Sequence, residues 1–273
     1  MQASHRWSPP GGTLGTIVEE AYDRARLLAH DHSARLTAGL ERAPSAPSLA
    51  HALRTSSVAV LAEVKRRSPS KGTIAAGLDA VGQAAAYRDG GAAAVSILTE
   101  PNHFGGSAGD LEAVRRAVNL PILKKDFHVE VIQLVEARVL GASAALLIAR
   151  ALAPDRLITL VNEGLALGLE LLVEVRDEEE LETAIQARAT MIGVNNRNLE
   201  TLVIDPGTCD RLIPKIPAGI VAVAESGVQS LADVERYAAI GADAVLVGSV
   251  LSASADPRQA TRDLTGVPRR ARG

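Results

Sequence analysis

The sequence predicts an α/β protein folded as a (β/α)₈ TIM-type barrel with an N-terminal helical extension. Eight short apolar runs rich in β-branched residues recur along the chain, and such runs are typical of strands. Their starts lie about 27 residues apart, which is enough for one strand, one helix and two short loops. The runs are almost continuously apolar, as expected for parallel strands buried on both faces. They cover residues 58–64, 93–98, 121–123, 144–148, 170–175, 191–194, 220–224 and 244–247.

A weak internal repeat supports this count of βα units. The segments AYRDGGAAAVSI, ARVLGASAALLI and YAAIGADAVLVG each end an amphipathic helix at glycine and then enter a turn of small residues and an apolar strand. Eight such units without a second pattern favour a closed barrel over a doubly wound open sheet, which usually has fewer strands. The predicted catalytic barrel occupies residues 57–265.

Residues 1–56 lie outside the repeat. After a start rich in proline and glycine, the segment TIVEEAYDRARLLAHDHSARL has apolar residues at helical spacing, so we expect an additional helix that packs on the barrel. Residues 43–47 are predicted to form a linker, and residues 266–273 a frayed C-terminal tail.

Composition excludes several classes of function. The 273 residues include 29 basic and 32 acidic side chains, a net charge of −3, so no bulk positive field favours nucleic acid or an anionic membrane. The one cysteine cannot form an internal disulfide, the N-terminus does not match a secretory signal peptide, and no run approaches the roughly 20 apolar residues of a membrane span. We therefore expect a cytoplasmic protein. No set of Cys, His and carboxylate residues has the spacing of metal ligands, so we expect no metal.

Polar residues follow most of the predicted strands, at the end where such a barrel carries its active site. Two-residue periodicity places Glu63 and Lys65 on one face of the first strand, about 7 Å apart along it. A structural ion pair would explain these two alone, but acids and bases from several strands converge on the same rim, which favours catalysis. Strand parity does not decide between Lys124 and Lys125. The other candidates are Asp126, Glu174, Asn195, Asn196, Arg197, Glu225, Ser226, Gly248 and Ser249.

The ends of the last two strands, AESGV and LVGS, are predicted to bind a phosphate. There Ser226, Gly227, Gly248 and Ser249 expose backbone amides in the loops that usually form the phosphate site of such barrels. The loop RRSPSKG after the first strand either closes over the ligand or is a solvated basic loop. The two phenylalanines, at 104 and 127, follow the second and third strands, where they either contact a flat ligand or pack under a loop.

Seven ordered segments, AEVKRRSPSKG, SILTE, PILKKDF, LLVEV, IGVNNRNL, AESGV and VLVGS, resemble the indole-3-glycerol phosphate synthase family of tryptophan biosynthesis. The resemblance extends from the N-terminal helix to about residue 255. It implies a (β/α)₈ barrel and a carboxy-lyase without a cofactor. The family converts 1-(2-carboxyphenylamino)-1-deoxyribulose 5-phosphate into indole-3-glycerol phosphate, CO₂ and water.

The resemblance also implies residue roles. Lys125 is similar to the family's general acid and Glu174 to its base, while Lys65 would assist loss of the hydroxyl or bind the phosphate and carboxylate. Glu63 and Glu225 would stabilise the cationic intermediate. The substrate would be held by Ser68, Phe104, Asn195, Arg197 and Ser226, and its phosphate by Gly227, Gly248 and Ser249.

Two departures from the family pattern leave alternatives open. The loop after the second strand contains Pro101, Asn102 and His103, and Arg150 follows the fourth strand where an apolar residue is expected. A paralogue that runs the same reaction in a specialised pathway, and a non-catalytic docking barrel, are therefore kept as alternatives. A phosphoribosyl isomerase or a Schiff-base aldolase is less favoured. We expect a phosphorylated small-molecule substrate and a monomer or weak oligomer, with other enzymes of the pathway as candidate partners.

Overall fold

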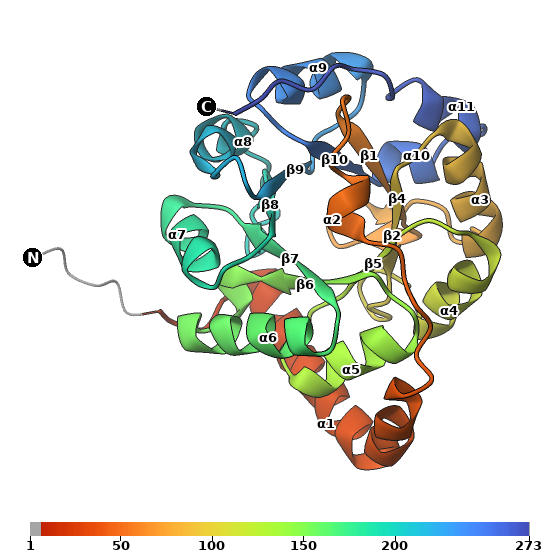
Figure 1. The fold of residues 1–273 in the computed structure, drawn as a ribbon, viewed down its shortest axis with the longest axis vertical. Coiled ribbons are helices and arrows are strands. Elements are labelled where there is room, and N and C mark those ends of the chain that lie inside the picture. Colours follow the sequence, from red (N-terminus) through yellow and green to blue (C-terminus); the bar gives the residue numbers. More distant parts are fainter. Residues whose placement is uncertain (1–6, 273) are drawn as a thin grey trace, which may run out of the picture.

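The structure of the chain is a computed structural model that describes residues 7–272. Within that range, eight parallel strands close into a barrel around which the helices lie (Figure 1). The predicted (β/α)₈ barrel is therefore confirmed. The barrel strands are β1 (Ala59–Val64), β4 (Ala94–Leu98), β5 (Ile122–Lys125), β6 (Ala144–Ile148), β7 (Glu170–Val175), β8 (Met191–Asn195), β9 (Val221–Glu225) and β10 (Ala244–Val247).

The helices begin where side chains can satisfy the free amides of a first turn. Asp79 and Asp177 accept hydrogen bonds from such amides, and Ser230 forms a capping box with Asp233. The helices between the strands are α3 (Ala80–Gly90), α4 (Ala108–Ala117), α5 (Val131–Val139), α6 (Pro154–Ala166), α7 (Glu178–Gln186), α8 (Gly207–Leu212) and α9 (Leu231–Ala239), and β10 is followed by α10 (Ser249–Ser252) and α11 (Pro257–Arg262).

The register of the strands brings polar residues together at one end of the barrel. Glu174 lies beside Gly193 in the next strand, and Asn195 lies beside Glu225. Nearly every strand residue is buried, because one face packs in the barrel interior and the other against the helices. This burial explains why the strands read as continuous apolar runs.

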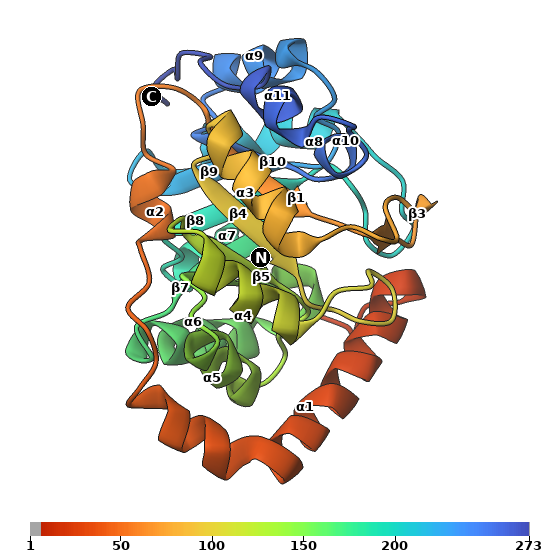
Figure 2. The same ribbon diagram turned by 90° about the vertical axis from the view of Figure 1, so that its right-hand side faces the viewer.

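The N-terminal extension packs on the outside of the barrel. Helix α1 (Gly12–Leu40) lies against α5 and runs the length of the barrel from the end that bears the hairpin of β2 (Arg67–Ser68) and β3 (Gly72–Thr73) (Figure 2). The short helix α2 (Leu49–Ala52) then sits at the start of β7, where the Glu170 carboxylate accepts hydrogen bonds from the amides of Leu49 and Ala50.

None of the described helices is long and apolar enough to cross a membrane. The division into residues 1–56, 57–265 and 266–273 stays a prediction, and residues 1–6 and 273 lie outside the described part of the chain.

The prediction of a frayed C-terminal tail is wrong for the residues that the structure describes. The side chain of Arg272 is only 3% exposed and pairs with Asp243 at 2.8 Å. Its guanidinium also donates to the carbonyl oxygens of Ile216, Ile220 and Gly241. The acceptors that hold Arg272 come from loops distant in the sequence. The segment PRRARG alone therefore looks like a solvated tail.

Replacing Asp243 by alanine should lower the free energy of unfolding by about 3 kcal/mol. The substitution leaves the buried guanidinium of Arg272 without a counter-charge and the amide of Ala222 without its acceptor. Chemical denaturation followed by circular dichroism measures the loss. Asp263→Ala, on the exposed surface of the same region, should change the free energy of unfolding by less than about 0.5 kcal/mol. Equal stabilities of the two variants would contradict a structural role for the tail.

Candidate active site

Two adjoining pockets open at the C-terminal ends of the strands, and of the site residues predicted from the sequence only Lys124 and Asn196 line neither of them. The central pocket is lined by Glu63, Lys65, Ser68, Phe104, Lys125, Glu174, Asn195, Arg197, Glu225 and Ser226. The outer pocket shares several of these and adds Gly227, Gly248 and Ser249. The residues come from seven strands and the loops that follow them, so the barrel alone brings them together.

The central pocket contains two lysine–carboxylate groups. The Nζ atom of Lys125 lies 3.5 Å from Glu174 and 3.5 Å from Glu225, and that of Lys65 lies 3.1 Å from Glu63. The side chain of Lys125 is 15% exposed, while those of Glu174 and Glu225 are 4% and 2% exposed. Such charges interact more strongly than they would in water, because little solvent screens them.

Burial and neighbouring charges shift the proton affinities of this cluster. Burial alone would lower the pKa of Lys125, but the carboxylates of Glu225, Glu174 and Glu63 outweigh it and raise the pKa above its ordinary value. Lys125 is therefore an ammonium group at neutral pH. Burial raises the pKa of Glu225 to about 8, against the opposing effect of Lys125 and with the help of Glu174 and Glu63. One oxygen of Glu225, Oε1, is buried without a hydrogen-bond partner in the described part of the chain.

Two glycines make room for the buried carboxylates. A Cβ on Gly193, in β8, would lie 2.0 Å from Oε1 of Glu225, and one on Gly248 would lie 2.5 Å from Oε1 of Glu63. A glycine is therefore required at position 248 to leave room for the Glu63 carboxylate, and the same residue also lines the outer pocket. The sequence prediction missed Gly193, because a glycine inside an apolar strand gives no signal of which side chain crosses it.

Hydrogen bonds orient the polar residues at the end of β8. The Asn195 amide donates to Glu174 at 2.9 Å, and its carbonyl oxygen accepts from the backbone N–H of Arg197 at 2.9 Å. The Arg197 guanidinium donates to the carbonyl oxygen of Leu202, and burial lowers its pKa. No carboxylate of the described residues lies within ion-pair distance of this guanidinium, so its charge can bind an anionic ligand.

Lys124 and Lys125 have different surroundings. Lys124 points away from both pockets: its side chain is fully buried, with Nζ 2.8 Å from Glu136 on α5 and 3.9 Å from Asp126. Lys125 points into the central pocket. The structure thereby resolves the alternative that strand parity left open.

The two phenylalanines lie together at the rim. Their ring centroids are 6.1 Å apart, and Nζ of Lys65 lies 5.6 Å from the centroid of Phe104. Both rings line the central pocket. They can therefore contact a flat ligand while one of them faces a cation.

A strained turn borders the outer pocket. Ser226 has φ +64°, a value that non-glycine residues rarely adopt, and Gly227 has φ +101°. The buried amide of Asn196 holds the turn by donating to the carbonyl oxygen of Ser226 at 2.9 Å and to the hydroxyl of Tyr237 at 2.8 Å. Asn196 therefore positions the turn without lining either pocket.

The loop after β1 is held by its own pairing and by a contact to α4. It forms a hairpin of β2 (Arg67–Ser68) and β3 (Gly72–Thr73), and the Arg66 guanidinium binds both carboxylate oxygens of Asp110 at the start of α4. The hairpin places Ser68 in the central pocket and Lys71 in the outer one. These positions favour the ligand-covering alternative for this loop.

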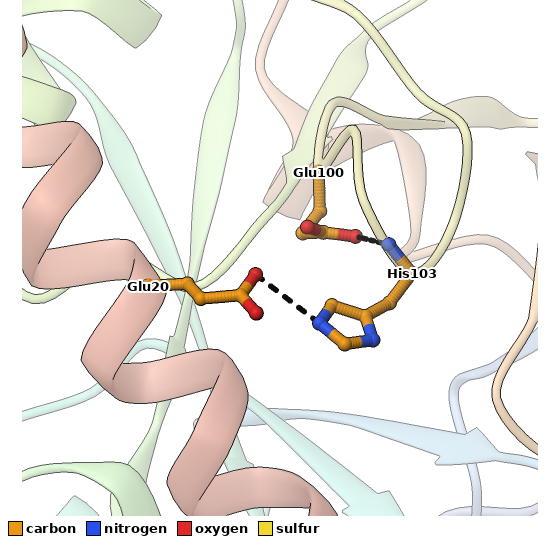
Figure 3. A group of neighbouring side chains, drawn as sticks. All are labelled: Glu20, Glu100 and His103. Atoms are coloured by element: carbon orange, nitrogen blue, oxygen red, sulfur yellow. Dashed lines mark hydrogen bonds and ion pairs between the residues drawn. The ribbon is translucent and has the colours of Figure 1, made fainter.

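An acidic group anchors the loop that carries Phe104. Figure 3 shows Glu20 of α1 directed toward the ring of His103, at 3.2 Å, and Glu100 against the backbone of its own loop. Glu20, Glu100 and His103 are close enough together for a metal ion. However, the Glu100 oxygens already accept from the backbone N–H groups of Asn102, His103 and Phe104. We therefore interpret the group as a clamp on the loop.

Apolar residues of α1 and of the loop after β8 complete the central pocket. Leu14 and Ile17 of α1 line it, together with Leu199 and Leu202. The sequence prediction placed α1 on the barrel but missed this contribution, because apolar residues at helical spacing look the same whether they face a core or a ligand.

The unusual Arg150 does not line the central pocket. Its guanidinium pairs with Glu200 at 2.9 Å and donates to the carbonyl oxygen of Ser8 at 2.8 Å. Its charge is therefore neutralised at the edge of the site, beside the loops after β7 and β8.

Comparison with known proteins identifies the family. The family model for indole-3-glycerol phosphate synthase matches residues 16–264. The chain belongs to this family. It is 48% identical to the indole-3-glycerol phosphate synthase of Streptomyces griseus over 91% of this chain and 94% of that one, and 50% identical to that of Rhodococcus opacus over the same shares. The resemblance found in the sequence is thus confirmed.

More distant solved structures share only the fold. The 3-hexulose-6-phosphate synthase of Salmonella typhimurium superposes with a TM-score of 0.60 at 16% identity, covering 76% of this chain and 96% of that one. A thiamine phosphate pyrophosphorylase of Pyrococcus furiosus superposes with a TM-score of 0.58 at 17% identity, covering 78% and 95%. Both likenesses support the barrel and say nothing about the reaction.

Replacing Gly193 by alanine should lower kcat at least tenfold, because the added Cβ displaces the Glu225 carboxylate from its place beside Lys125. Steady-state kinetics measures the loss, and thermal unfolding checks the fold. Gly219→Ala is the matched control, since a Cβ there meets no atom within 4 Å. A normal kcat for Gly193→Ala would show that position 193 does not have to be glycine.

Proposed function

We propose that the lysines and carboxylates of the central pocket carry out the indole-3-glycerol phosphate synthase reaction. The single observation that supports this most is the position of Lys125 between Glu174 and Glu225 in a pocket that also holds a second lysine–carboxylate pair. Ring closure, decarboxylation and dehydration require an acid at a carbonyl, an acid at a departing hydroxyl, and a base. The family membership assigns the chain to the carboxy-lyases of tryptophan biosynthesis.

In the first step, Lys125 acts as the general acid. It protonates the carbonyl oxygen of the substrate while the ring carbon that bears the carboxylate attacks the carbonyl carbon. Positive charge then develops on the anilino nitrogen, and the buried carboxyl groups of Glu63 and Glu225 stabilise it, because a positive charge nearby favours the ionised form of Glu225. Loss of CO₂ returns the electron pair to the ring and restores its aromaticity.

In the second step, the hydroxyl left by ring closure departs as water. Lys65 assists its protonation, and Glu174 removes the proton from the adjacent carbon to give the indole. The Asn195 amide holds one oxygen of Glu174, which leaves the other, 3.5 Å from Lys125, to act as the base. Arg197 and the ring of Phe104 hold the carboxyphenyl part of the substrate.

The outer pocket binds the phosphate of the substrate. Ser226, Gly227, Gly248 and Ser249 line it, and Lys71 adds a positive charge at its edge. The positive φ angles of the Ser226–Gly227 turn allow successive backbone amides to face one anion. This pocket adjoins the central one through Lys65, so a single ligand can occupy both.

We propose that the enzyme is cytoplasmic and is a monomer or weak oligomer, with the phosphorylated substrate as its principal partner. The low net charge supports a small-molecule partner, and the thiol of Cys209 is buried, which raises its pKa to about 12 and makes it unreactive. The complete set of acids and bases supports a catalytic function over a docking barrel. A role in a specialised tryptophan-derived pathway has no support in the central pocket, because Arg150 lies outside it.

Lys125→Ala should lower kcat at least about 100-fold while the protein stays folded, because it removes the proposed general acid. Formation of indole-3-glycerol phosphate from the carboxyphenylamino-deoxyribulose phosphate, followed by indole fluorescence, measures it. The neighbouring Lys124→Ala should instead lower stability and leave the chemical step largely intact in the folded fraction, since Lys124 pairs with Glu136 outside the pocket. A normal kcat for Lys125→Ala would refute its role.

Ser249→Ala should raise KM several-fold and change kcat little, because backbone amides still hold part of the phosphate. Steady-state kinetics with the phosphorylated substrate measures both constants. Ser254→Ala, in the loop after α10 and outside both pockets, is the control. A fall in kcat at unchanged KM would show that the outer pocket does not hold the phosphate in the ground state.

A further inference from the structure

One face of α1 changes from apolar to charged as the helix leaves the central pocket. Leu14 and Ile17 line that pocket. Spacings of three and four residues place Glu20 and Arg24 on the same face of the helix. Glu20 accepts a hydrogen bond from the side-chain amide of Asn102, in the loop after β4, at 2.9 Å. The charged part of this face therefore contacts the loops at the rim of the barrel.

The guanidinium of Arg24 binds two of these loops at once. Its Nη2 atom donates to Oδ1 of Asp126 at 2.9 Å, and its Nη1 atom lies 3.5 Å from Oε1 of Glu100. Asp126 directly follows Lys125 in the loop after β5, and Glu100 belongs to the loop after β4. One guanidinium can hold two carboxylates because its nitrogens point in fixed and different directions. Arg24 therefore ties both loops to α1 and to each other.

Both carboxylates are buried, and both hold the backbone of the rim. The side chain of Glu100 is 0% exposed and that of Asp126 is 8% exposed. Glu100 accepts from three backbone N–H groups of its own loop, the last of them that of Phe104, and Asp126 accepts from the N–H of Phe127 at 2.8 Å. Within residues 7–272, Arg24 is the only ion-pair partner of Glu100. The bridge thus fixes the backbone that carries both phenylalanines.

Ring closure depends on the relative position of these two loops. In the reaction proposed above, Phe104 of the loop after β4 contacts the aromatic ring that attacks, and Lys125 at the end of β5 protonates the carbonyl that is attacked. A misplacement of about 1 Å between reacting groups can lower a rate about 100-fold. The phosphate is bound elsewhere, because no residue of either loop lines the outer pocket. An error in the spacing of the loops should therefore affect the chemical step more than substrate binding.

We propose that Arg24 of α1 is a positioning residue for ring closure. By bridging Asp126 and Glu100, it holds Lys125 and the ring of Phe104 at the separation that the reaction requires. Arg24 itself lines neither the central nor the outer pocket, so it acts through the loops and not on the substrate. The inference rests on the role proposed above for Lys125.

The first test is Arg24→Lys, which keeps the positive charge but has a single nitrogen that cannot occupy both guanidinium positions. We expect kcat to fall about tenfold while KM changes less than about twofold, because the loops lose their common spacing and the phosphate site is unchanged. Steady-state kinetics measures both constants, and thermal unfolding checks the fold. Arg26→Lys is the matched control and should behave as wild type, since Arg26 is exposed and pairs only with Asp23 of its own helix among the described residues.

The second test is rescue of Arg24→Ala by a small cation. Guanidinium chloride at millimolar, non-denaturing concentration should restore part of kcat, because free guanidinium can occupy the place between the two carboxylates. Methylammonium chloride at the same concentration has the same charge but only one nitrogen, and it should restore much less. A residue that only stabilises the fold would not produce this difference between the two cations.

Three results would overturn the inference. A wild-type kcat in Arg24→Lys would show that the bridge is not needed, and a loss confined to KM would show that Arg24 affects binding and not ring closure. Equal rescue by the two cations, or none by either, would show that the two-pronged contact does not set the rate. Failure of the proposed acid would instead appear as normal turnover in Lys125→Ala, whatever the Arg24 variants do, so the two failures can be told apart.

Discussion

Three carboxylates and two lysines share one desolvated pocket, and the surrounding structure must compensate for burying them. Each buried charge has a high desolvation cost, so a carboxylate here is tolerated only next to an ammonium group or several hydrogen-bond donors. Lys125 supplies that compensation for Glu174 and Glu225, and Lys65 does so for Glu63. Such an arrangement favours charge stabilisation in a reaction over maximal stability of the fold.

The barrel makes this arrangement rigid because the charged groups lie at strand ends, where the backbone is hydrogen-bonded on both sides. Strand register fixes which residues are neighbours: Asn195 beside Glu225, and Glu174 beside the bare Gly193. At the rim of the central pocket, the Asp126 carboxylate pairs with Arg24 of α1 and accepts a hydrogen bond from the hydroxyl of Thr99, which fixes the loop directly after Lys125. Side chains fixed by packing and by hydrogen bonds or ion pairs to further residues keep the distances that catalysis requires.

The sequence predicts most of this architecture because its signals are local. Each strand is a continuous apolar run, and the residue after it is a candidate for the active site whatever the details of the fold. Properties that depend on distant contacts escape such reasoning. The docking of Arg272 needs carbonyls from two loops distant in the sequence, the choice of Lys125 over Lys124 needs the exact end of β5, and the role of Leu14 needs the path of α1. Glu180 is the clearest case, since the acidic start of α7 looks the same in the sequence whether Glu180 faces solvent or, as here, is half-buried at a cavity that Glu174 also lines.

The two ends of the site have different linings, and this difference fits the order of the chemistry. The outer pocket, after β9 and β10, contains glycines, serines and Lys71, while the cavity after β7 combines carboxyl groups with the guanidinium groups of Arg150, Arg176 and Arg197. With the roles proposed above, a substrate held by its phosphate at one end places its reacting carbons between them, at the two lysines. These lysines have different surroundings: Lys125 lies between two carboxylates, and Lys65 lies beside one carboxylate and the face of Phe104. Two acids on separate strands, each with its own partners, suit a reaction that protonates two different oxygens in turn.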